Sequence, residues 1–589
     1  MTFDGLFNSL LSDTGESLRA FGPELALSVT VVVMLLLRVL TPNRLERLTL
    51  WVTAWLPLVG ASVGLYLAAP WLHLGEGASS AEAGREIFTG LLLYDPLTVF
   101  FRAFLMLFVF LFVVFTQISG VPNRDDATDF YALVLGATVG MCLMASANHL
   151  LIVFLAVEMA SVPSYALSGI MKGRKRASEA AIKYAVYGAG AAGVMLYGIS
   201  LLAGVTGSAH LPTMARQLAL LLETGQAPTM VLVLGGLMVM AGLAFKLSAV
   251  PFHFWCPDVF EGATAEVNAF LSVASKGAAL ALLVRVALGL GYVAPLPVPE
   301  EQPVAHVALV GSTAEVADER FAEAAGRSAT AARVAPRFAS QEVSAAPIAA
   351  DDTEAMIRQL APVRTFMVWI IAGVAAVTCT FGNLAAYGQT NIKRLLAYST
   401  IAHAGYMMMP VAAAVALIDR DTVEAGRAIG FLAFYIGCYL FMNLGAFAIV
   451  AFLRNAMRSE EIADYAGLIR NCPFVAISMM IILLSLIGIP PMAGFVAKLS
   501  IFYTLVPAEL WWLLAIGGLN TVLSLFYYLR VIKLMIVDPE PETRLPFSLP
   551  VTSFAGVYVG LVTAPVVILG IWGDDLFRWT GAAARNLLP

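Results

Sequence analysis

Charged residues are scarce in this sequence, and their scarcity excludes most classes of protein. Only 13% of the 589 residues are Asp, Glu, Lys or Arg, whereas 60% are hydrophobic. A soluble chain of this length could not hide so much apolar surface, so the composition indicates a protein that crosses a lipid bilayer many times. The net charge of −5 is spread thinly along the chain, and we expect no nucleic-acid partner.

Cysteine is also rare, and it never occurs in a metal-binding spacing. The five cysteines lie far apart and form no CxxC pair, so the sequence supports neither an iron–sulfur site nor a zinc site. We expect them to act as small apolar residues that hold no metal ion. They are Cys142, Cys256, Cys379, Cys438 and Cys472.

A secretory signal peptide is missing from the start of the sequence. Residues 1–22 contain Asp4, Asp13 and Glu16 instead of a basic start followed by an apolar core. We therefore expect membrane insertion to begin with a helix that the protein retains.

Apolar sequence is abundant, in runs of about 20 residues, which is the length that crosses a bilayer as a helix. We count about fourteen runs and predict an all-α fold with one transmembrane helix for each. Asp95 and Pro96 fit an N-cap followed by proline at the first helical position of the third helix. The runs are 23–41, 49–72, 97–117, 130–147, 149–170, 180–203, 229–256, 264–290, 365–386, 392–418, 428–453, 472–506, 511–537 and 550–572.

Basic residues predict how these helices are oriented. Arginine and lysine cluster in the connections that follow odd-numbered runs, so these connections share one face of the membrane. Cytoplasmic connections are enriched in Lys and Arg, which makes that face cytoplasmic and both termini periplasmic. The residues that carry this prediction are Arg38, Arg44, Arg47, Arg124, Lys172, Arg174, Lys175, Arg176, Lys393, Arg394, Arg454, Arg458, Arg530 and Lys533.

Residues 295–362 interrupt the pattern of apolar runs. They are rich in Ala and Pro, lack Trp and Tyr, and hold ten acidic residues against five arginines. By the orientation above, this low-complexity segment is periplasmic. It is either a disordered loop or contains a short surface helix near residues 314–333. We interpret it as an insertion rather than a second catalytic domain.

Two runs are too long and too interrupted for one straight helix. Residues 229–257 contain Pro251, and residues 473–506 contain Pro490 and Pro491. Proline removes a backbone donor and clashes with the preceding turn, so each helix is predicted to break within the membrane. Two such breaks suggest two inverted five-helix repeats. The predicted divisions are 1–125 (helices 1–3), 126–294 (first repeat), 295–362 (insertion), 363–538 (second repeat) and 539–589 (helix 14).

Four apolar runs carry one charge each near mid-depth, namely Glu158, Lys246, Lys276 and Lys498. A charge at the bilayer centre costs about 2.5–3.5 kcal/mol even on the mildest scale. Each side chain could instead extend to the membrane–water interface or simply hold two helices in contact. Glu158, however, lies about 12 Å from either end of its helix and has a short side chain. Four such charges favour a functional interpretation.

A glutamate and a lysine at mid-membrane can act as a proton switch. Burial disfavours the charged form of a lysine and a nearby carboxylate restores it, so protonation depends on whether the pair is closed. Helix breaks expose backbone groups that hold water, and water with titratable side chains makes a proton path. We expect Glu158 and Lys246 to meet directly or through water.

Weaker signals are left open or favour a structural role. His403 fits a satisfied core residue and a proton relay between Lys276 and Lys498 equally well. The glycine pattern GAGAAG at residues 188–193 follows no strand, which favours helix packing over dinucleotide binding.

Other charges near the ends of apolar runs favour structural roles. Arg285 and Arg364 fit anchors at the outer membrane interface. Lys183 and His253 lie near helix ends or breaks, and we leave them out of the candidate site.

Six stretches together resemble the antiporter-like membrane subunits of respiratory complex I, the bacterial proton-pumping NADH–quinone oxidoreductase, and most of all its N-subunit family. The resemblance covers nearly the whole chain except the N-terminal residues and the segment 295–362. The stretches are FLAVEMASVPSYAL, SEAAIKYAVYGA, FKLSAVPFHFWCPDVFEGA, FLSVASKGA, QTNIKRLLAYSTIAHAGY and SLIGIPPMAGFVAKLSIF.

The resemblance implies fourteen helices in two inverted repeats, with helices 7 and 12 broken. It places Glu158 on helix 5, Lys246 on helix 7, Lys276 on helix 8 and Lys498 on helix 12. It also implies that FMN, iron–sulfur clusters and quinone are bound by partner subunits, and that neighbouring antiporter-like and small K-type subunits are among these partners in a bacterial inner membrane. Lysine at the helix-12 position argues against the M subunit, which has glutamate there.

Two other functions share these features. A subunit of a multi-subunit cation/proton antiporter has the same kind of fold, and would move Na⁺ as well as protons. A structural scaffold that moves no ion is the third alternative, and the four buried charges argue against it.

Overall fold

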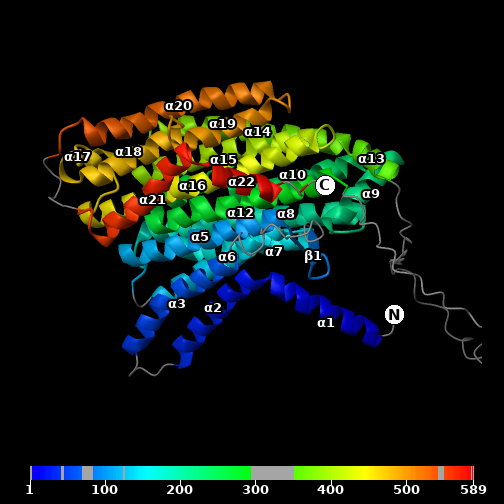
Figure 1. Ribbon diagram of the computed structural model, residues 1–589, viewed down its shortest axis with the longest axis horizontal. Helices are drawn as coiled ribbons and strands as arrows, with labels where there is room; N and C mark the ends of the chain where they lie inside the picture. The colour runs from blue at the N-terminus through cyan, green and yellow to red at the C-terminus, as the bar shows by residue number, and fades with distance from the viewer. Residues whose placement is uncertain are drawn as a thin grey trace, which may run out of the picture.

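The computed structural model is a bundle of long helices that run along one common direction (Figure 1). It describes residues 3–40, 46–68, 84–123, 126–293, 350–541, 549–584 and 587. Arg44, Arg124 and the helix expected near residues 314–333 lie outside the described residues. Apart from one two-stranded hairpin, the regular structure of the described residues is helical.

The helices and strands follow the chain in three groups. The first group is α1 (Phe3–Ala20), α2 (Gly22–Leu40), α3 (Glu46–Leu67), β1 (Arg85–Ile87), β2 (Leu92–Tyr94) and α5 (Pro96–Ser119). The second is α6 (Ala127–Ser146), α7 (Leu150–Ser168), α8 (Lys175–Thr206), α9 (Leu211–Glu223), α10 (Thr229–Leu247), α11 (Trp255–Gly262) and α12 (Ala265–Gly291). The third is α13 (Ala350–Gln359), α14 (Ala361–Ala386), α15 (Ile392–Leu417), α16 (Thr422–Met457), the 3-10 helix η3 (Ile462–Tyr465), α17 (Leu468–Asn471), α18 (Pro473–Ile487), α19 (Ala493–Leu505), α20 (Trp511–Ile536), α21 (Phe554–Ile571) and α22 (Asp574–Ala584).

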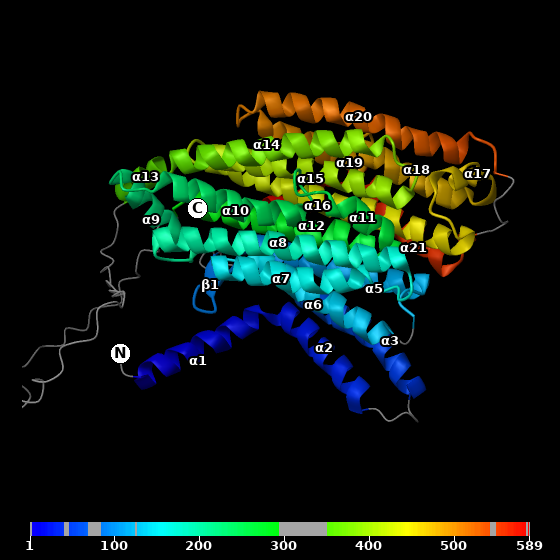
Figure 2. The ribbon, with the colours of Figure 1, turned by 180° about the vertical axis from the view of Figure 1, so that it is seen from behind.

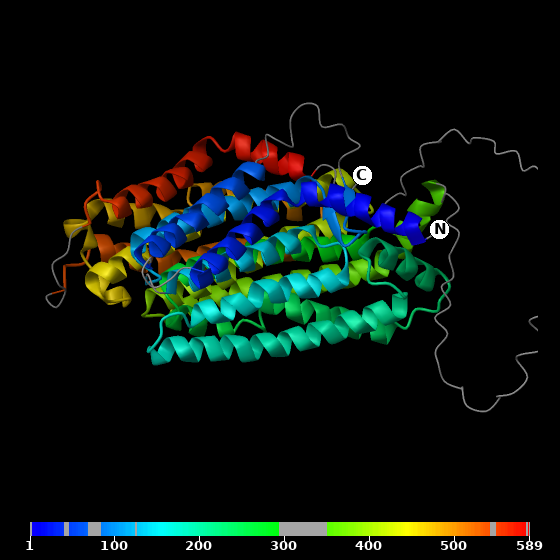
Figure 3. The ribbon, with the colours of Figure 1, turned by 90° about the horizontal axis from the view of Figure 1, so that it is seen from below.

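The described helices account for all the predicted spans. Twelve of them are long and apolar enough to cross a membrane. The helix α3 and the interrupted pair α18 and α19 occupy the two remaining apolar runs, which confirms the prediction of about fourteen spans. The central helices α12, α15 and α16 are almost wholly buried, whereas α8 and α20 lie at the edges and leave most of their surface for lipid (Figures 2 and 3).

Asp95 has the N-cap role that the sequence predicts. Its carboxylate accepts a hydrogen bond from the Thr98 backbone N–H at 2.8 Å, and Pro96 is the first residue of α5. The same carboxylate accepts a hydrogen bond at 2.6 Å from Nη1 of Arg285, which is only 5% exposed. The expectation that Arg285 anchors at the membrane surface is therefore wrong, because it is the cation of a buried ion pair.

Connections after odd-numbered spans meet at one end of the bundle, which we call the basic end. It comprises residues 119–123, 126, 169–176, 262–266, 387–394, 455–467 and 534–541. Asn455 Nδ2 donates to the Ser119 carbonyl at 2.9 Å, and the Ile462 N–H donates to the Thr390 carbonyl at 2.7 Å. These contacts join connections that are far apart in sequence, as the distribution of basic residues predicts.

Connections after even-numbered spans meet at the opposite end, which we call the hairpin end. It comprises residues 84–95, 147–149, 207–211, 291–293, 350–364 and 418–421. His210 Nε2 lies 2.9 Å from Glu86 Oε1, and this hydrogen bond holds the pKa of the Glu86 carboxyl below its usual value. The hairpin of β1 and β2 is thereby fixed to the connection between α8 and α9, and α13 packs against α9 nearby.

Both predicted breaks are present, and they run in opposite directions. Ser248, in the left-handed region at φ 58°, ends α10 ahead of Pro251, and Gly488, at φ 91°, ends α18 ahead of Pro490 and Pro491. The chain enters α10 from the hairpin end and α18 from the basic end (Figure 1). The two broken helices are therefore antiparallel, which is the arrangement that inverted repeats require.

The glycine pattern at residues 188–193 lies in the middle of α8. A Cβ at Gly188 would come within 2.0 Å of the Tyr165 hydroxyl of α7, whereas Gly190 and Gly193 have no neighbour within 4 Å. Gly188 therefore permits close helix packing, as predicted, and the pattern belongs to a helix instead of a strand-to-helix turn.

Candidate functional site

The candidate site begins where Lys246 reaches from α10 to α7. Lys246 is 1% exposed, and its Nζ donates a hydrogen bond to Ser161 Oγ at 3.0 Å. Glu158 precedes Ser161 by three residues on α7, and its buried Oε1 has no hydrogen-bond partner among the described residues. Of the two arrangements expected from the sequence, the direct contact between Glu158 and Lys246 is not observed. The lysine is instead bound one helical turn away from the carboxylate.

Lys276 joins α12 to α15 in the centre of the bundle. It is 1% exposed, and its Nζ donates to the main-chain carbonyl of Thr400 at 3.0 Å. A carbonyl accepts this hydrogen bond but cannot neutralise an ammonium charge. Among the described residues, Lys276 has no carboxylate partner within salt-bridge distance.

His403 lies in a buried cluster of hydroxyl groups. Its Nδ1 is 2.7 Å from the Tyr435 hydroxyl of α16, and its Nε2 is 3.5 Å from the Tyr528 hydroxyl of α20. Tyr528 also bonds to Ser399, which lies one turn before His403 on α15. Both ring nitrogens therefore face groups that can donate or accept a proton.

Lys498 lies at the second break. Its Nζ donates hydrogen bonds of 2.9 Å to the carbonyls of Leu486 and Ile487, the last two residues of α18. The carbonyl end of a helix carries partial negative charge, which stabilises an ammonium group there. The same Nζ lies 4.6 Å from the centre of the Tyr406 ring, at cation–π distance.

Helix α15 connects three of these contacts along one side. Thr400, His403 and Tyr406 are spaced three residues apart, so successive members are separated by a rise of about 4.5 Å. Lys276 contacts the first of them and Lys498 the third, with His403 between. The α15 side chains therefore place a titratable group between two buried lysines.

The predicted site residues thus fall into two groups. Lys276, His403 and Lys498 lie along α15, whereas Glu158 lies on α7 and Lys246 reaches α7 from α10 without contacting Glu158. Among the described residues, no side-chain hydrogen bond joins one group to the other. A proton that passes between the groups would have to cross this gap, either through water or through a movement of α10.

Comparison with known proteins identifies the family of this chain. The model of the family described as "NADH:quinone oxidoreductase/Mrp antiporter, TM" matches residues 147–295 and 353–524. The chain belongs to this family.

Individual members of the family resemble the chain over nearly its whole length. NADH-quinone oxidoreductase subunit N from Anaeromyxobacter sp. is 35% identical, over 98% of this chain and 99% of the relative. A chain of respiratory complex I from Thermus thermophilus superposes with a TM-score of 0.65 at 26% identity, covering 95% of this chain and 99% of the other. A chain of the Mrp complex from Dietzia sp. has a TM-score of 0.68 at 18% identity, with 97% and 98% covered, and so shares the fold.

Sequence reasoning finds the charged members of the antiporter-like site and misses their neutral partners. Ser161, Tyr406, Tyr435 and Tyr528 are hydroxyl residues within apolar helices, and such residues are common there. A signal exists for two of them, because Ser161 follows Glu158 and Tyr406 follows His403 by three residues, which places each pair on one side of a helix.

Other charged residues of this family member lie apart from the site. Lys183 forms ion pairs with Glu179 at 2.8 Å and with Asp258 at 2.9 Å, in a charged cleft near the basic end that Glu261 and Arg394 also line. Within the part of the chain that the structure describes, no three His, Cys, Asp or Glu residues are arranged to hold a metal ion.

Proposed function

We propose that this chain is a proton-translocating membrane subunit of an NADH–quinone oxidoreductase. The observation that carries the proposal is the pair of buried lysines, Lys276 and Lys498, that contact one side of α15 on either side of His403. Family membership and the likeness to N subunits support it. A scaffold without transport would gain nothing from burying these charges without carboxylate partners.

Proton movement starts at the Glu158 and Lys246 group. When Lys246 swings from Ser161 to Glu158, its ammonium gains a counter-ion and keeps its proton. When it returns to Ser161, the ammonium loses that counter-ion and gives its proton toward Lys276. The proton then passes from Lys276 through His403 to Lys498. Each step moves one proton from a protonated nitrogen to a neutral one, and none needs a redox centre in this chain.

The energy for these steps comes from quinone reduction elsewhere in the complex. FMN, iron–sulfur clusters and quinone would be held by partner subunits, and neighbouring antiporter-like and small K-type subunits would pack against this chain. The basic end would face the cytoplasm of a bacterial inner membrane, with both termini in the periplasm.

Purification from native membranes tests this function. Solubilised chain should co-purify with iron–sulfur and quinone-reducing subunits, and vesicles containing the complex should take up protons when NADH is oxidised. Isolation of the chain in a complex without any redox subunit would contradict the proposal.

A subunit of a multi-subunit cation/proton antiporter is the second candidate, and the shared fold of the Mrp complex favours it. In that case the purified complex would exchange Na⁺ for protons in vesicles without NADH or quinone. The same purification therefore separates the two candidates.

A further inference from the structure

The break between α10 and α11 is held by a side chain from the other repeat. In this break the Ser248 and Ala249 N–H groups donate to the carbonyls of Phe245 and Ala244 at the end of α10. The next N–H, of Val250, donates instead to Thr378 Oγ1 of α14 at 2.9 Å. Thr378 is fully buried, and its hydroxyl is the acceptor that α14 offers to the break.

This hydrogen bond gives the Val250 backbone N–H a partner where lipid could give none. The residues after Val250 lie at the edge of the bundle, since Pro251 is exposed and Phe254 is 47% exposed. Lipid offers no partner to a backbone N–H, so an unwound segment at the edge must find its partners in the protein. Thr378 supplies one for Val250.

A ring contact strengthens the same attachment. The His253 ring of the break meets the Phe381 ring of α14 edge to face, with ring centres 4.3 Å apart. Phe381 follows Thr378 by three residues, so both lie on the side of α14 that faces the break.

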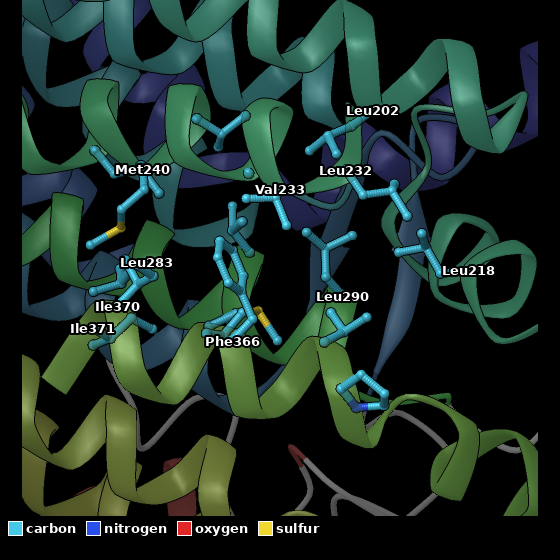
Figure 4. Close-up of a pocket in the computed structure, with 18 of the residues that line it drawn as sticks. Leu202, Leu218, Leu232, Val233, Met240, Leu283, Leu290, Phe366, Ile370 and Ile371 are labelled. Carbon is cyan, nitrogen blue, oxygen red and sulfur yellow. The ribbon is translucent and has the colours of Figure 1, made fainter. Parts of the chain in front are cut away.

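On the N-terminal side of the break, an apolar groove of about 170 Å³ separates α10 from α14. Val233 and Met240 of α10 and Phe366 and Ile370 of α14 line it (Figure 4). The two helices are therefore loosely packed along this part, and the break is where α14 holds the α10 segment.

Helix α14 is also packed against α15 around His403. A Cβ at Gly382 would come within 2.6 Å of the Ala402 backbone nitrogen, and one at Gly405 within 2.6 Å of the Cys379 backbone nitrogen. These two contacts flank His403 and bring the backbones of α14 and α15 together. The helix α14 thus contacts both the break that follows Lys246 and the segment of α15 that carries His403.

We propose that Thr378 is a positioning residue for proton transfer. Its hydroxyl ties the break of the first repeat to α14, and α14 transmits movement of the Lys246 end of α10 to the His403 segment of α15. This inference rests on the proposed function, and it supplies a link between the two groups of site residues that no side-chain hydrogen bond joins.

The test compares three variants in the purified complex. Thr378→Val keeps the shape and removes the acceptor, and Thr378→Ser keeps the hydroxyl. Thr365→Val is the matched control, because the Thr365 hydroxyl donates only to Ala361 of its own helix, at 2.8 Å. Two quantities are measured, namely amide hydrogen exchange in residues 248–254 and protons taken up per NADH oxidised in vesicles.

Thr378→Val should raise exchange in residues 248–254 by about tenfold and lower proton uptake per NADH severalfold. Thr378→Ser and Thr365→Val should match the wild type in both. Unchanged hydrogen exchange in Thr378→Val would show that Thr378 does not hold the break. Raised exchange with normal proton uptake would show that Thr378 has no role in proton transfer. If Thr378→Val does not assemble, Thr378→Cys is used in its place. If Thr378→Ser then loses as much proton uptake as Thr378→Cys, the hydroxyl has no role.

A second comparison separates this inference from the function on which it rests. Lys246→Ala should abolish uptake through this chain, and adding Thr378→Val to it should reduce uptake no further. Normal uptake in Lys246→Ala would contradict the proposed function while the exchange result for Thr378 stands. Further loss in the double variant would overturn the link between Thr378 and Lys246.

Discussion

Single residues decide how Lys246 can work, because two acceptors on α7 compete for it. Ser161 holds the ammonium at 3.0 Å, and Glu158 lies one turn away with a buried oxygen that has no hydrogen-bond partner among the described residues. Serine offers a hydrogen bond without a charge, whereas glutamate offers both. Moving Lys246 between them therefore changes how strongly it holds its proton.

The first prediction concerns Glu158→Gln, Lys246→Ala and the double variant. Each single change should lower coupled NADH–quinone turnover by about tenfold or more, because each removes one half of the switch. The double variant should lose little more than the worse single, since one switch can be broken only once. Turnover and proton uptake in vesicles measure this, and strictly additive losses would show that the residues act separately.

The second prediction concerns the lysines that meet α15. Lys276→Ala and Lys498→Ala should each reduce proton uptake severalfold while the complex keeps its full content of FMN and iron–sulfur clusters. The reason is that Lys276 contacts one main-chain carbonyl, and Lys498 contacts two carbonyls and the Tyr406 ring, so neither lysine touches a group that would ligate a cofactor. Uptake is measured beside the electron paramagnetic resonance spectrum, and loss of cluster signals in an assembled variant would contradict the assignment.

The sequence predicts the charged residues of the site because a charge is rare in an apolar helix. Glu24 and Arg102 carry the same signal in apolar helices, and they form a buried ion pair with atoms 2.5 Å apart. Hydroxyl partners such as Tyr435 and Tyr528 are harder to predict, because serine and tyrosine carry no comparable cost in a membrane helix. Which lysine faces which carbonyl depends on packing between helices that are distant in the sequence.

At the scale of elements, the second break depends on two glycines. Gly488 has φ 91°, and a Cβ there would come within 3.0 Å of the Lys498 side chain. A Cβ at Gly494 would come within 1.9 Å of the Ser485 carbonyl oxygen, so α18 and α19 approach more closely than any larger residue allows. Their close approach brings the last carbonyls of α18 to Lys498.

The third prediction follows from that approach. Gly494→Ala should destabilise the chain by about 1–3 kcal/mol, because the backbone of one half-helix must move to make room. Gly518→Ala on α20 is the control, since a Cβ there meets nothing within 4 Å. The thermal unfolding midpoint of the purified complex measures both, and equal midpoints would show that the break tolerates the extra methyl group.

Length and hydropathy suffice to predict the long helices, and the breaks are predicted by proline within an overlong run, since Pro163 and Pro410 lie inside unbroken helices. Elements that do not cross the membrane are harder to predict, as α9, α17 and α22 illustrate. These helices are 13 residues or shorter, and no apolar run of spanning length marks them. The strands β1 and β2 are only three residues each, and they are held by Glu86 and His210, which are 124 residues apart. Such contacts leave no periodic pattern in the sequence.

For the whole molecule, the fourth prediction concerns the segment between α12 and α14. Deleting residues 300–345 should leave assembly and proton uptake close to those of the wild type, because the deleted part has no Trp or Tyr and few groups able to form a core. The deletion stops before α13, which packs against α9 and whose Ile357 carbonyl accepts a 2.5 Å hydrogen bond from Arg364. Loss of the assembled complex would show that the segment binds a partner.

The last prediction concerns the orientation of the whole bundle. Basic residues gather at the end that contains residues 169–176 and 387–394, and the hairpin end carries α9 and α13. Since positive residues are retained in the cytoplasm, the two ends should differ in their access to a reagent that cannot cross the membrane. Single cysteines test this at Gly388, which is exposed at the basic end, at Gln226, which is exposed beyond α9, and at Ser328, which belongs to the segment predicted to be periplasmic. In intact cells an impermeant maleimide should label Gln226→Cys and Ser328→Cys, and should label Gly388→Cys only after the cells are opened.

The wild type serves as background, because its five cysteines are buried. Equal labelling of Gly388→Cys and Gln226→Cys in intact cells would contradict the orientation, and reversed labelling would place both termini in the cytoplasm.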